Sequence, residues 1–388
     1  MRRRNGYPNR QRKGAVLVLA ALFMVVILGM VAFAVDFGYL AMARTELQRS
    51  ADAAAIAGCW ELMDTSPPGT TANLTAEIAL ARQAASQYVA SNSVCNSTVG
   101  VNSNSANQSG GDIVIGNLNN PSLGSSTLTF TNPNQYNAVQ VQVSKSASAN
   151  GVVPLFFGRI FGMQGQAVSA QATAALLNSI SGFRVPADGR NLEILPFALD
   201  QQTWDDMLNG GGTDAYKWDE ATQTIVSGQD GVREINLYPQ GTGSPGNRGT
   251  VDIGSSNNST ADIARQIVQG VNQSDLNKIG GELKLDASGK LYLNGDTGIS
   301  AGIKDELASI KGKPRIIPIF STVVGPGNNA TYTIVKFAGV RILNVKLTGA
   351  MNGKNVMIQP AKIVTDGAIA NTSGTTSYTI YSPPWLVR

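Results

Sequence analysis

The first strong pattern along the chain is an uninterrupted apolar run near the amino terminus. Residues 14–35 read GAVLVLAALFMVVILGMVAFAV and carry no charged and no strongly polar side chain. About 20 such residues in a helix cross the ~30 Å hydrocarbon core of a bilayer. The pattern therefore predicts a transmembrane helix over residues 14–35, preceded by a cytoplasmic tail over residues 1–13.

The helical pattern continues past the apolar run as an amphipathic stretch without proline. Its apolar and small positions recur at three- and four-residue steps, at Leu40, Ala43, Leu47, Ala51, Ala54 and Gly58. We interpret them as a packing seam, because small residues let a second helix approach closely. The predicted partner is an alanine-rich helix over residues 73–90, which favours packing inside the chain. A homo-oligomer through the N-terminal helix stays open as the alternative.

Short runs with β-branched alternation dominate the chain beyond residue 96. In the first part, strands are expected over residues 111–118, 126–132, 137–145 and 167–174, with a short helix over 155–161. In the second part, helices are expected over 200–208, 260–271 and 299–310, and strands over 234–238, 316–320, 332–337, 340–347 and 355–360.

These elements predict an α+β protein with two extracytoplasmic units. Residues 36–180 would form a helical hairpin plus a sheet, in a pilin-like layout. Residues 181–388 would form a strand-rich α+β domain, in which the strands from Arg315 onward suggest a small barrel or sandwich.

Charge is distributed unevenly along the chain. Six basic residues lie within the first thirteen positions, and the first acidic residue is Asp36, directly after the apolar run. The positive-inside rule then places the amino terminus in the cytoplasm and the bulk of the chain beyond the inner membrane, in the periplasm or outside the cell. The other 24 basic residues face 26 acidic ones, which leaves the body near −2 and argues against nucleic-acid binding.

Two processing events compete with a retained anchor. Ala32-Phe33-Ala34 offers a signal-peptidase site, but the apolar run before it exceeds the usual length of roughly 7 to 15 residues. Gly14 follows basic residues, as in a type IV prepilin leader, but Leu19 occupies the fifth position after it, where those prepilins carry Glu. We therefore expect the anchor to be retained.

The amino-acid composition excludes most catalytic mechanisms. The chain contains no histidine, which excludes histidine-activated nucleophiles and every histidine-containing metal site. Cys59 and Cys95 are too few for a four-thiolate zinc site. Their predicted places at opposite ends of the helical hairpin disfavour a disulfide without excluding it. The chain is predicted to be non-enzymatic and to need no cofactor.

An ordered set of residues resembles a known family. The set is Gly14, Asp36, Gly38, Arg44, Gln48 and Asp52. Together with the apolar span, it resembles the amino-terminal segment of TadE/TadG-like tight-adherence (Flp) pilus assembly proteins, and the likeness continues more weakly to residue 180. The resemblance, of the TadG-like type, implies a membrane-anchored protein without catalytic residues. It implies the membrane and pilus assembly or envelope proteins as partners.

TadG-type proteins often end in a von Willebrand A domain, whose metal site uses Asp-x-Ser-x-Ser. Residues 252–256 read Asp-Ile-Gly-Ser-Ser, so Asp252 and Ser256 are weak candidate ligands. Gly254 replaces the first serine and removes one ligand, which favours a turn over a metal site.

Two further motifs are weaker. Residues 296–298 spell the Asp-Thr-Gly triplet of aspartic proteases, but no second copy exists to share a proton. Residues 239–249 are glycine-rich, yet lack the Gly-Lys-Ser/Thr ending of a phosphate-binding loop. We interpret both as surface turns.

Two functions from different classes remain. The favoured one is a structural or assembly component of a pilus or surface-adhesion system. The alternative is a membrane-anchored adhesin or ligand-binding module that holds calcium through Asp252 or an Asn/Asp-rich loop. Calcium-dependent thermal stabilisation would separate them, because a cation bound only to the native state raises the melting temperature.

Overall fold

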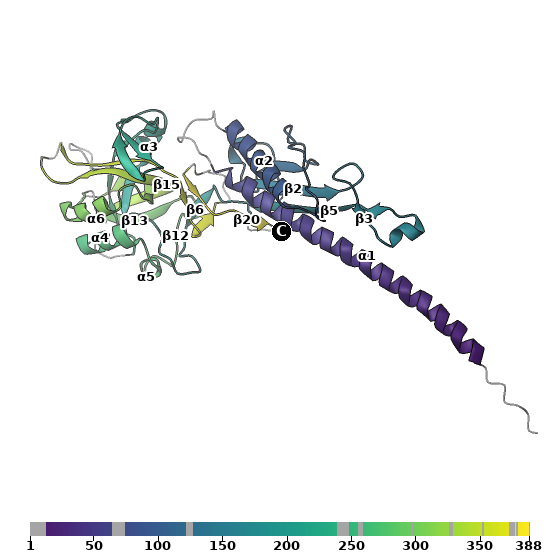
Figure 1. Cartoon of the computed structure of the whole chain (residues 1–388). Coiled ribbons are helices and arrows are strands. Elements are labelled where there is room, and N and C mark those ends of the chain that lie inside the picture. Colours follow the sequence, from purple (N-terminus) through teal and green to yellow (C-terminus); the bar gives the residue numbers. More distant parts are fainter. Residues whose placement is uncertain are drawn as a thin grey trace, which may run out of the picture.

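The fold begins with one continuous helix that is much longer than the apolar run. In the computed structural model, α1 (Lys13–Trp60) has 48 residues, which corresponds to about 70 Å at 1.5 Å per residue. The first part of α1 projects away from the rest of the chain, and its last part packs against the folded body (Figure 1). The predicted continuation of the apolar helix into a longer one is confirmed.

The structure describes residues 13–63, 74–121, 127–238, 248–254, 259–296, 298–325, 329–350, 353–371, 377 and 379–387. Residues 1–12 of the predicted basic tail, residues 239–247 and Ser256 lie outside the described residues.

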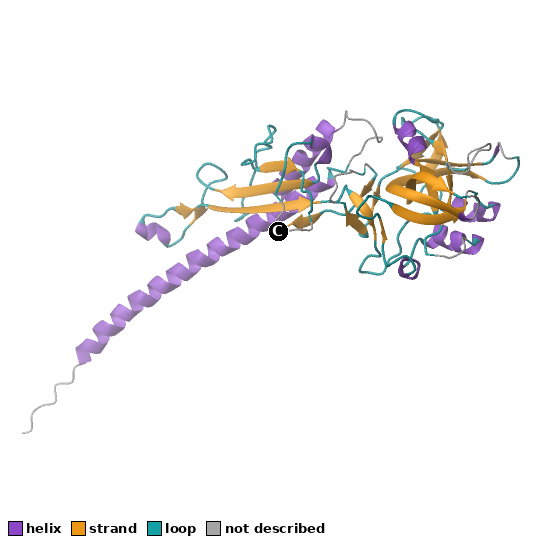
Figure 2. Cartoon of the chain, turned by 180° about the vertical axis from the view of Figure 1, so that it is seen from behind, coloured by secondary structure: helices purple, strands orange, loops and turns teal. Residues whose placement is uncertain are grey.

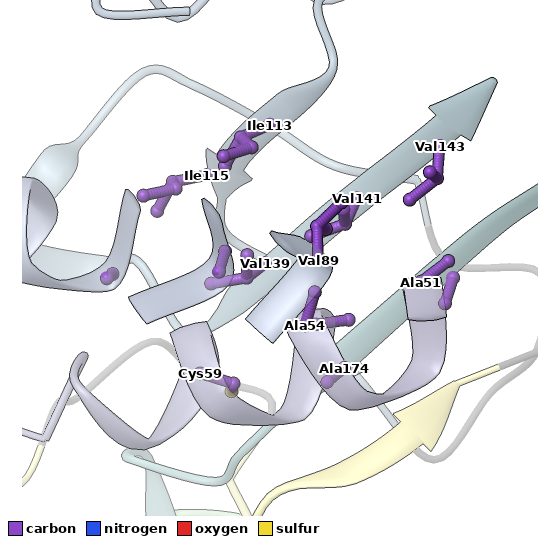
Figure 3. Close-up of a cluster of buried hydrophobic side chains, with 14 of the residues drawn as sticks. Ala51, Ala54, Cys59, Val89, Ile113, Ile115, Val139, Val141, Val143 and Ala174 are labelled. Carbon is purple, nitrogen blue, oxygen red and sulfur yellow. The ribbon is translucent and has the colours of Figure 1, made fainter. Parts of the chain in front are cut away.

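The amino-terminal unit is a helical hairpin laid on an antiparallel sheet. The second helix, α2 (Leu74–Ser91), packs along α1 as predicted. The sheet has the order β1 (Ile113–Gly116), β2 (Ala138–Lys145), β5 (Val168–Ala175) and β20 (Trp385–Val387). Figure 3 shows their common core, in which Val139, Val141 and Val143 point from β2 toward Ala51 and Ala54 of α1. The alternation of valine and polar residues along β2 produces this face.

A narrow ribbon extends from the amino-terminal unit along α1. It consists of β3 (Val153–Pro154) and β4 (Gly165–Gln166), which pair antiparallel and enclose the 3₁₀ helix η3 (Gly158–Phe161). The expected short helix over 155–161 is thus present as this shorter 3₁₀ turn. Another 3₁₀ turn, η2 (Pro133–Gln135), precedes β2.

The carboxy-terminal unit is built around a closed barrel of five strands. The barrel strands are β7 (Phe197–Asp200), β11 (Arg248–Val251), β13 (Leu291–Asp296), β14 (Pro314–Val324) and β15 (Ala330–Lys346). The ring closes because β14 pairs with both β7 and β15. Of the two predicted alternatives, barrel and sandwich, the structure has the barrel. Three of its strands, β7, β11 and β13, precede Arg315 in the sequence, where the prediction had placed the start of the barrel.

Three helices pack on the barrel (Figure 2): α3 (Gln201–Leu208), α4 (Thr260–Gln269) and α6 (Lys304–Ser309). Ile317 and Ile319 of β14 join their cluster, whereas Ile316 and Phe320 join a second cluster from the opposite face of the strand. Successive side chains of β14 point to opposite faces of the strand, so this strand contributes to two hydrophobic clusters.

Shorter elements complete the second unit. They are β6 (Ile180–Phe183), β8 (Tyr216–Asp219), β9 (Thr224–Ser227), β10 (Ile235–Asn236), α5 (Gln273–Asn277), β12 (Leu283–Lys284), η4 (Ala301–Ile303), β16 (Asn355–Pro360), β17 (Ile363–Val364), β18 (Ala368–Ala370) and β19 (Ile380–Tyr381). Of these, β16 and β10 extend the barrel sheet beyond β15.

Two expectations about strands were wrong. The strands expected over 332–337 and 340–347 form one strand, β15, because Gly339 is not a turn. A Cβ at Gly339 would collide with the backbone oxygen of Ala361, so glycine is needed for close approach of another chain segment. The strand expected over 126–132 is reduced, in its described part, to a single bridge between Thr129 and Asn117.

The last strand crosses the predicted division between the two units. Residues 385–387 of β20 pair antiparallel with residues 173–175 of β5, which lie about 210 residues earlier in the sequence. The division at residue 180 stays a prediction. The carboxyl end of the chain nonetheless completes the amino-terminal sheet and ties the two units together (Figure 1).

Candidate functional site

The predicted packing seam of α1 lies inside the amino-terminal unit. Ala43, Leu47, Ala51 and Ala54 are fully buried, and Leu40 is half-buried at the end nearest the apolar span. Leu47, Ala51 and Ala54 share one buried cluster with Ala81, Ala85 and Val89 of α2 and with the inward valines of β2. The seam is therefore occupied by this chain itself.

The surroundings of Gly58 explain why the seam ends in a glycine. A Cβ at this position would lie 2.9 Å from the backbone oxygen of Ala81 and 3.2 Å from a methyl group of Val139. The backbones of α1 and α2 approach so closely here that a side chain would force them apart.

Other motif residues of α1 have distinct environments. The Gln48 side chain donates to Asp52 Oδ1 at 2.8 Å and to the backbone oxygen of Gln171 at 3.1 Å, which joins α1 to β5. Arg44 is exposed, and Gly38 faces open space. Gly14 lies in α1, but its surroundings are outside the described side chains.

Asp36 connects α1 to the ribbon beyond β3. Its Oδ1 accepts from the backbone N–H of Phe156 at 2.7 Å, and its Oδ2 accepts from that of Gly158 at 2.7 Å. The Phe157 N–H lies between the two oxygens, at 3.3 and 3.2 Å. Three consecutive backbone donors thus converge on one carboxylate at the start of η3, an arrangement that favours an anion.

The sequence marked Asp36 only as a family residue and as the first acid. Its partners lie 120 residues further on, so no local pattern could assign them. The structure explains the glycine at position 158, because a Cβ there would lie 2.7 Å from a methyl group of Leu155, but the sequence alone does not connect Gly158 with Asp36.

Burial opposes ionisation of Asp36, but the three N–H donors outweigh it and hold the pKa of the carboxyl below its ordinary value of 3.8. Asp36 therefore stabilises the docked ribbon at pH values above its unfolded pKa. That stabilisation is lost as pH falls through the lower pKa of the folded state.

We expect Asp36→Asn to loosen the ribbon, because an amide offers one accepting oxygen where the carboxylate offers two. Backbone amide exchange over residues 155–163 should accelerate by roughly tenfold or more at neutral pH. The ratio of variant to wild-type rates at equal pH should shrink below about pH 4, as the wild-type carboxyl becomes protonated.

The matched control is Asp305→Asn, whose side chain is 93% exposed. It should leave exchange over residues 155–163 unchanged. Equal exchange rates in Asp36→Asn and wild type at neutral pH would show that the carboxylate does not hold the ribbon.

An apolar cavity of about 330 Å³ lies between α1 and the ribbon. Phe33 and Phe37 line it from α1, and Leu155, Phe161 and Met163 line it from the ribbon. Two ring contacts also join α1 to the ribbon: Phe33 stacks with Phe161 at 6.4 Å between centroids, and Tyr39 meets Phe156 edge-on at 5.2 Å. The Asp36 contact is therefore part of a wider interface between α1 and the ribbon.

The two cysteines are free thiols in the structure. Cys59 is buried, which raises the pKa of its thiol, and its sulfur lies 3.7 Å from the backbone oxygen of Asn137. The backbone N–H of Cys95 donates to Glu46 at 2.7 Å. Because Glu46 precedes Cys59 by 13 residues of helix, the thiols stand about 20 Å apart along α1.

The weak metal candidates do not form a cluster among the described residues. Asp252 is buried, and Ser256 lies outside the described part. Gly254 has φ +78°, and a Cβ there would collide with the backbone oxygen of Asp275. The Asp275 carboxylate pairs with Arg265 at 2.7 Å. Within the residues that the structure covers, no group of three His, Cys, Asp or Glu side chains could hold a metal.

The two remaining motifs are partly described. The Asp296 Oδ1 accepts from the backbone N–H of Gly298 at 3.0 Å, as in a turn, while Thr297 is outside the described residues. The glycine-rich run 239–249 is described only at its end, where Arg248 and Gly249 begin β11.

These features define a class: an α+β unit whose first helix begins as an exposed apolar span and continues into the core of the unit. Two family models match this part of the chain. The model described as "Putative Flp pilus-assembly TadE/G-like" matches residues 14–76, and the one described as "Putative Tad-like Flp pilus-assembly" matches residues 57–174. The amino-terminal part of the chain is therefore similar to TadE/G-like Flp pilus-assembly proteins. No curated protein and no solved structure is similar enough to the chain to count as a match.

Proposed function

We propose that this chain is a non-enzymatic, membrane-anchored component of a tight-adherence (Flp) pilus assembly system, of the TadG-like type. The supporting observation is the continuity of α1. Its apolar first part is not buried in the chain, and the same helix then contributes Leu47, Ala51 and Ala54 to the core of the unit that the family models match. A helix that is both anchor and core would hold the folded units at a fixed place beyond the bilayer.

The proposed orientation places the amino terminus in the cytoplasm and the two units beyond the inner membrane. The basic residues before the span and the acidic Asp36 after it support this orientation. The pilus or envelope proteins that the family implies would then be met on the outer side.

A homo-oligomer through the N-terminal helix would need a surface other than the seam, which α2 and the sheet already occupy. Phe37 and Met42 of α1 are 70% and 43% exposed and lie outside that core. Contacts with a second copy or with a partner helix would use such exposed positions of α1 and the apolar span.

Deleting the gene should abolish surface pili, as seen by electron microscopy and by surface adhesion. The full chain should restore them. A variant whose residues 14–35 are exchanged for a cleavable signal peptide should not, because the folded units would be released from the membrane. Exchange for an unrelated apolar span is the matched control and should restore pili if the span is only an anchor.

Wild-type piliation after deletion would contradict the pilus role, and full rescue by the released variant would contradict anchoring. The same cells test orientation. A membrane-impermeant thiol label should reach Ser109→Cys, which is exposed, and should not reach Asn5→Cys. Equal labelling of the two positions would refute the orientation.

A further inference from the structure

The ribbon that Asp36 holds ends in large apolar side chains without cover. We define the apolar tip as residues 156–163. Its exposed fractions are 58% for Phe156, 76% for Ile160, 68% for Phe161 and 48% for Met163. Scattered exposed apolar residues are common, but several in one short loop mark a contact surface.

The apolar tip lies level with the end of the apolar span. Phe161 stacks on Phe33, which is only two residues before the end of the span at Val35. Phe156 contacts Tyr39 just beyond the span. Figures 1 and 2 show the ribbon of β3 reaching along α1 toward its projecting part, away from the barrel.

This level fixes the depth of the tip in a membrane. Two residues of helix correspond to about 3 Å, so Phe33 would lie about 3 Å inside the outer edge of a ~30 Å core spanned by residues 14–35. Phe161 shares that depth because it stacks on Phe33. A bilayer that surrounds the end of the span would therefore also contact the tip.

The chemistry of the tip fits the outer leaflet. Its exposed rings and aliphatic chains lie beside α1, where Phe161 and Met163 line the same cavity as Phe33 and Phe37. Arg159 is exposed within the tip, and its long side chain can place the charge among lipid phosphates while its stem stays in the apolar layer. The carboxylate of Asp36, which lies next to the span, is not left without partners, because it accepts hydrogen bonds from three backbone N–H groups of the tip.

We propose that residues 156–163 form a second membrane contact, in which the apolar tip inserts into the phospholipids of the outer leaflet beside α1. The proposal rests on the proposed membrane anchoring. A single helix leaves the folded units free to rotate and tilt, whereas two attachment points fix one side of the sheet toward the bilayer. Asp36 is then a positioning residue that holds the tip at interface depth.

The test uses the full chain, with Cys95→Ser, in vesicles of phosphatidylethanolamine and phosphatidylglycerol that contain no other protein. An environment-sensitive fluorophore is attached to Ile160→Cys, at the exposed tip. Leu22→Cys in the apolar span is the positive control, and the exposed Gln83→Cys on α2 is the aqueous control. Nitroxide lipids labelled near the head or near the end of the acyl chain act as quenchers.

The Ile160 probe should have blue-shifted emission and be quenched mainly by lipids whose nitroxide lies near the headgroup. The Leu22 probe should be quenched mainly by deep nitroxides, and the Gln83 probe by neither. Adding Asp36→Asn should shift the Ile160 signal toward that of Gln83 without moving the Leu22 signal.

An Ile160 probe as unquenched as Gln83, with Leu22 quenched, would overturn the lipid contact and leave the anchor intact. Blue-shifted but unquenched emission would assign the tip to a second copy of the chain and would also overturn the proposal. Loss of quenching at Leu22 as well would refute the anchor and, with it, this inference.

Discussion

Leu47→Ala should destabilise the amino-terminal unit by about 2–5 kcal/mol. Leu47 is fully buried where α1 meets α2 and the sheet, and truncation removes its contacts and leaves a cavity that packed neighbours fill only in part. Hydrogen–deuterium exchange of the full chain in vesicles measures the effect locally. Amides of α1 beyond residue 43, α2 and β2 should exchange faster, and amides of the barrel should not.

Leu80→Ala provides the matched control, because Leu80 is 41% exposed on α2. Its effect should stay within about 0.5 kcal/mol. A loss of copurifying pilus components in Leu47→Ala with unchanged exchange in α1 and α2 would mean that the seam binds a partner, contrary to its burial in this chain.

Gly254→Ser should destabilise the carboxy-terminal unit by about 3 kcal/mol or more. The substitution restores the serine that a von Willebrand A metal site would need, so a metal-site interpretation predicts tighter calcium binding. The structure predicts the opposite effect. Gly254 has φ +78°, and its missing Cβ leaves room for the backbone of Asp275.

Gly189→Ser is the control for backbone strain alone, since Gly189 also has φ +78° but nothing lies within 4 Å of an added Cβ. It should cost about 1–3 kcal/mol, less than Gly254→Ser. Thermal unfolding with and without calcium decides between the interpretations. A rise in melting temperature with calcium that appears or grows in Gly254→Ser would support a metal site at Asp252.

Much of the candidate site could be predicted because it lies on one helix. The three- and four-residue spacing of Ala43, Leu47, Ala51 and Ala54 predicted a buried face, and the structure buries all four. The docking of Asp36 could not be predicted, because a carboxylate has no sequence signal for backbone donors 120 residues away. Their proximity depends on the path of the ribbon, which the sheet determines.

The sequence by itself determined the elements that depend on local periodicity. The apolar run, the helical spacing and the alternation along β2 each extend over many consecutive residues of one segment. They therefore predicted the ends of α1, α2 and β2 to within one or two residues. Only the tertiary structure decided the long-range pairings. β7 and β11 have four residues each, too few to show a pattern, and the barrel closes only when β14 meets both β7 and β15. The return of β20 to β5 likewise joins residues about 210 apart, and such pairings are stabilised by collective burial rather than by local propensity.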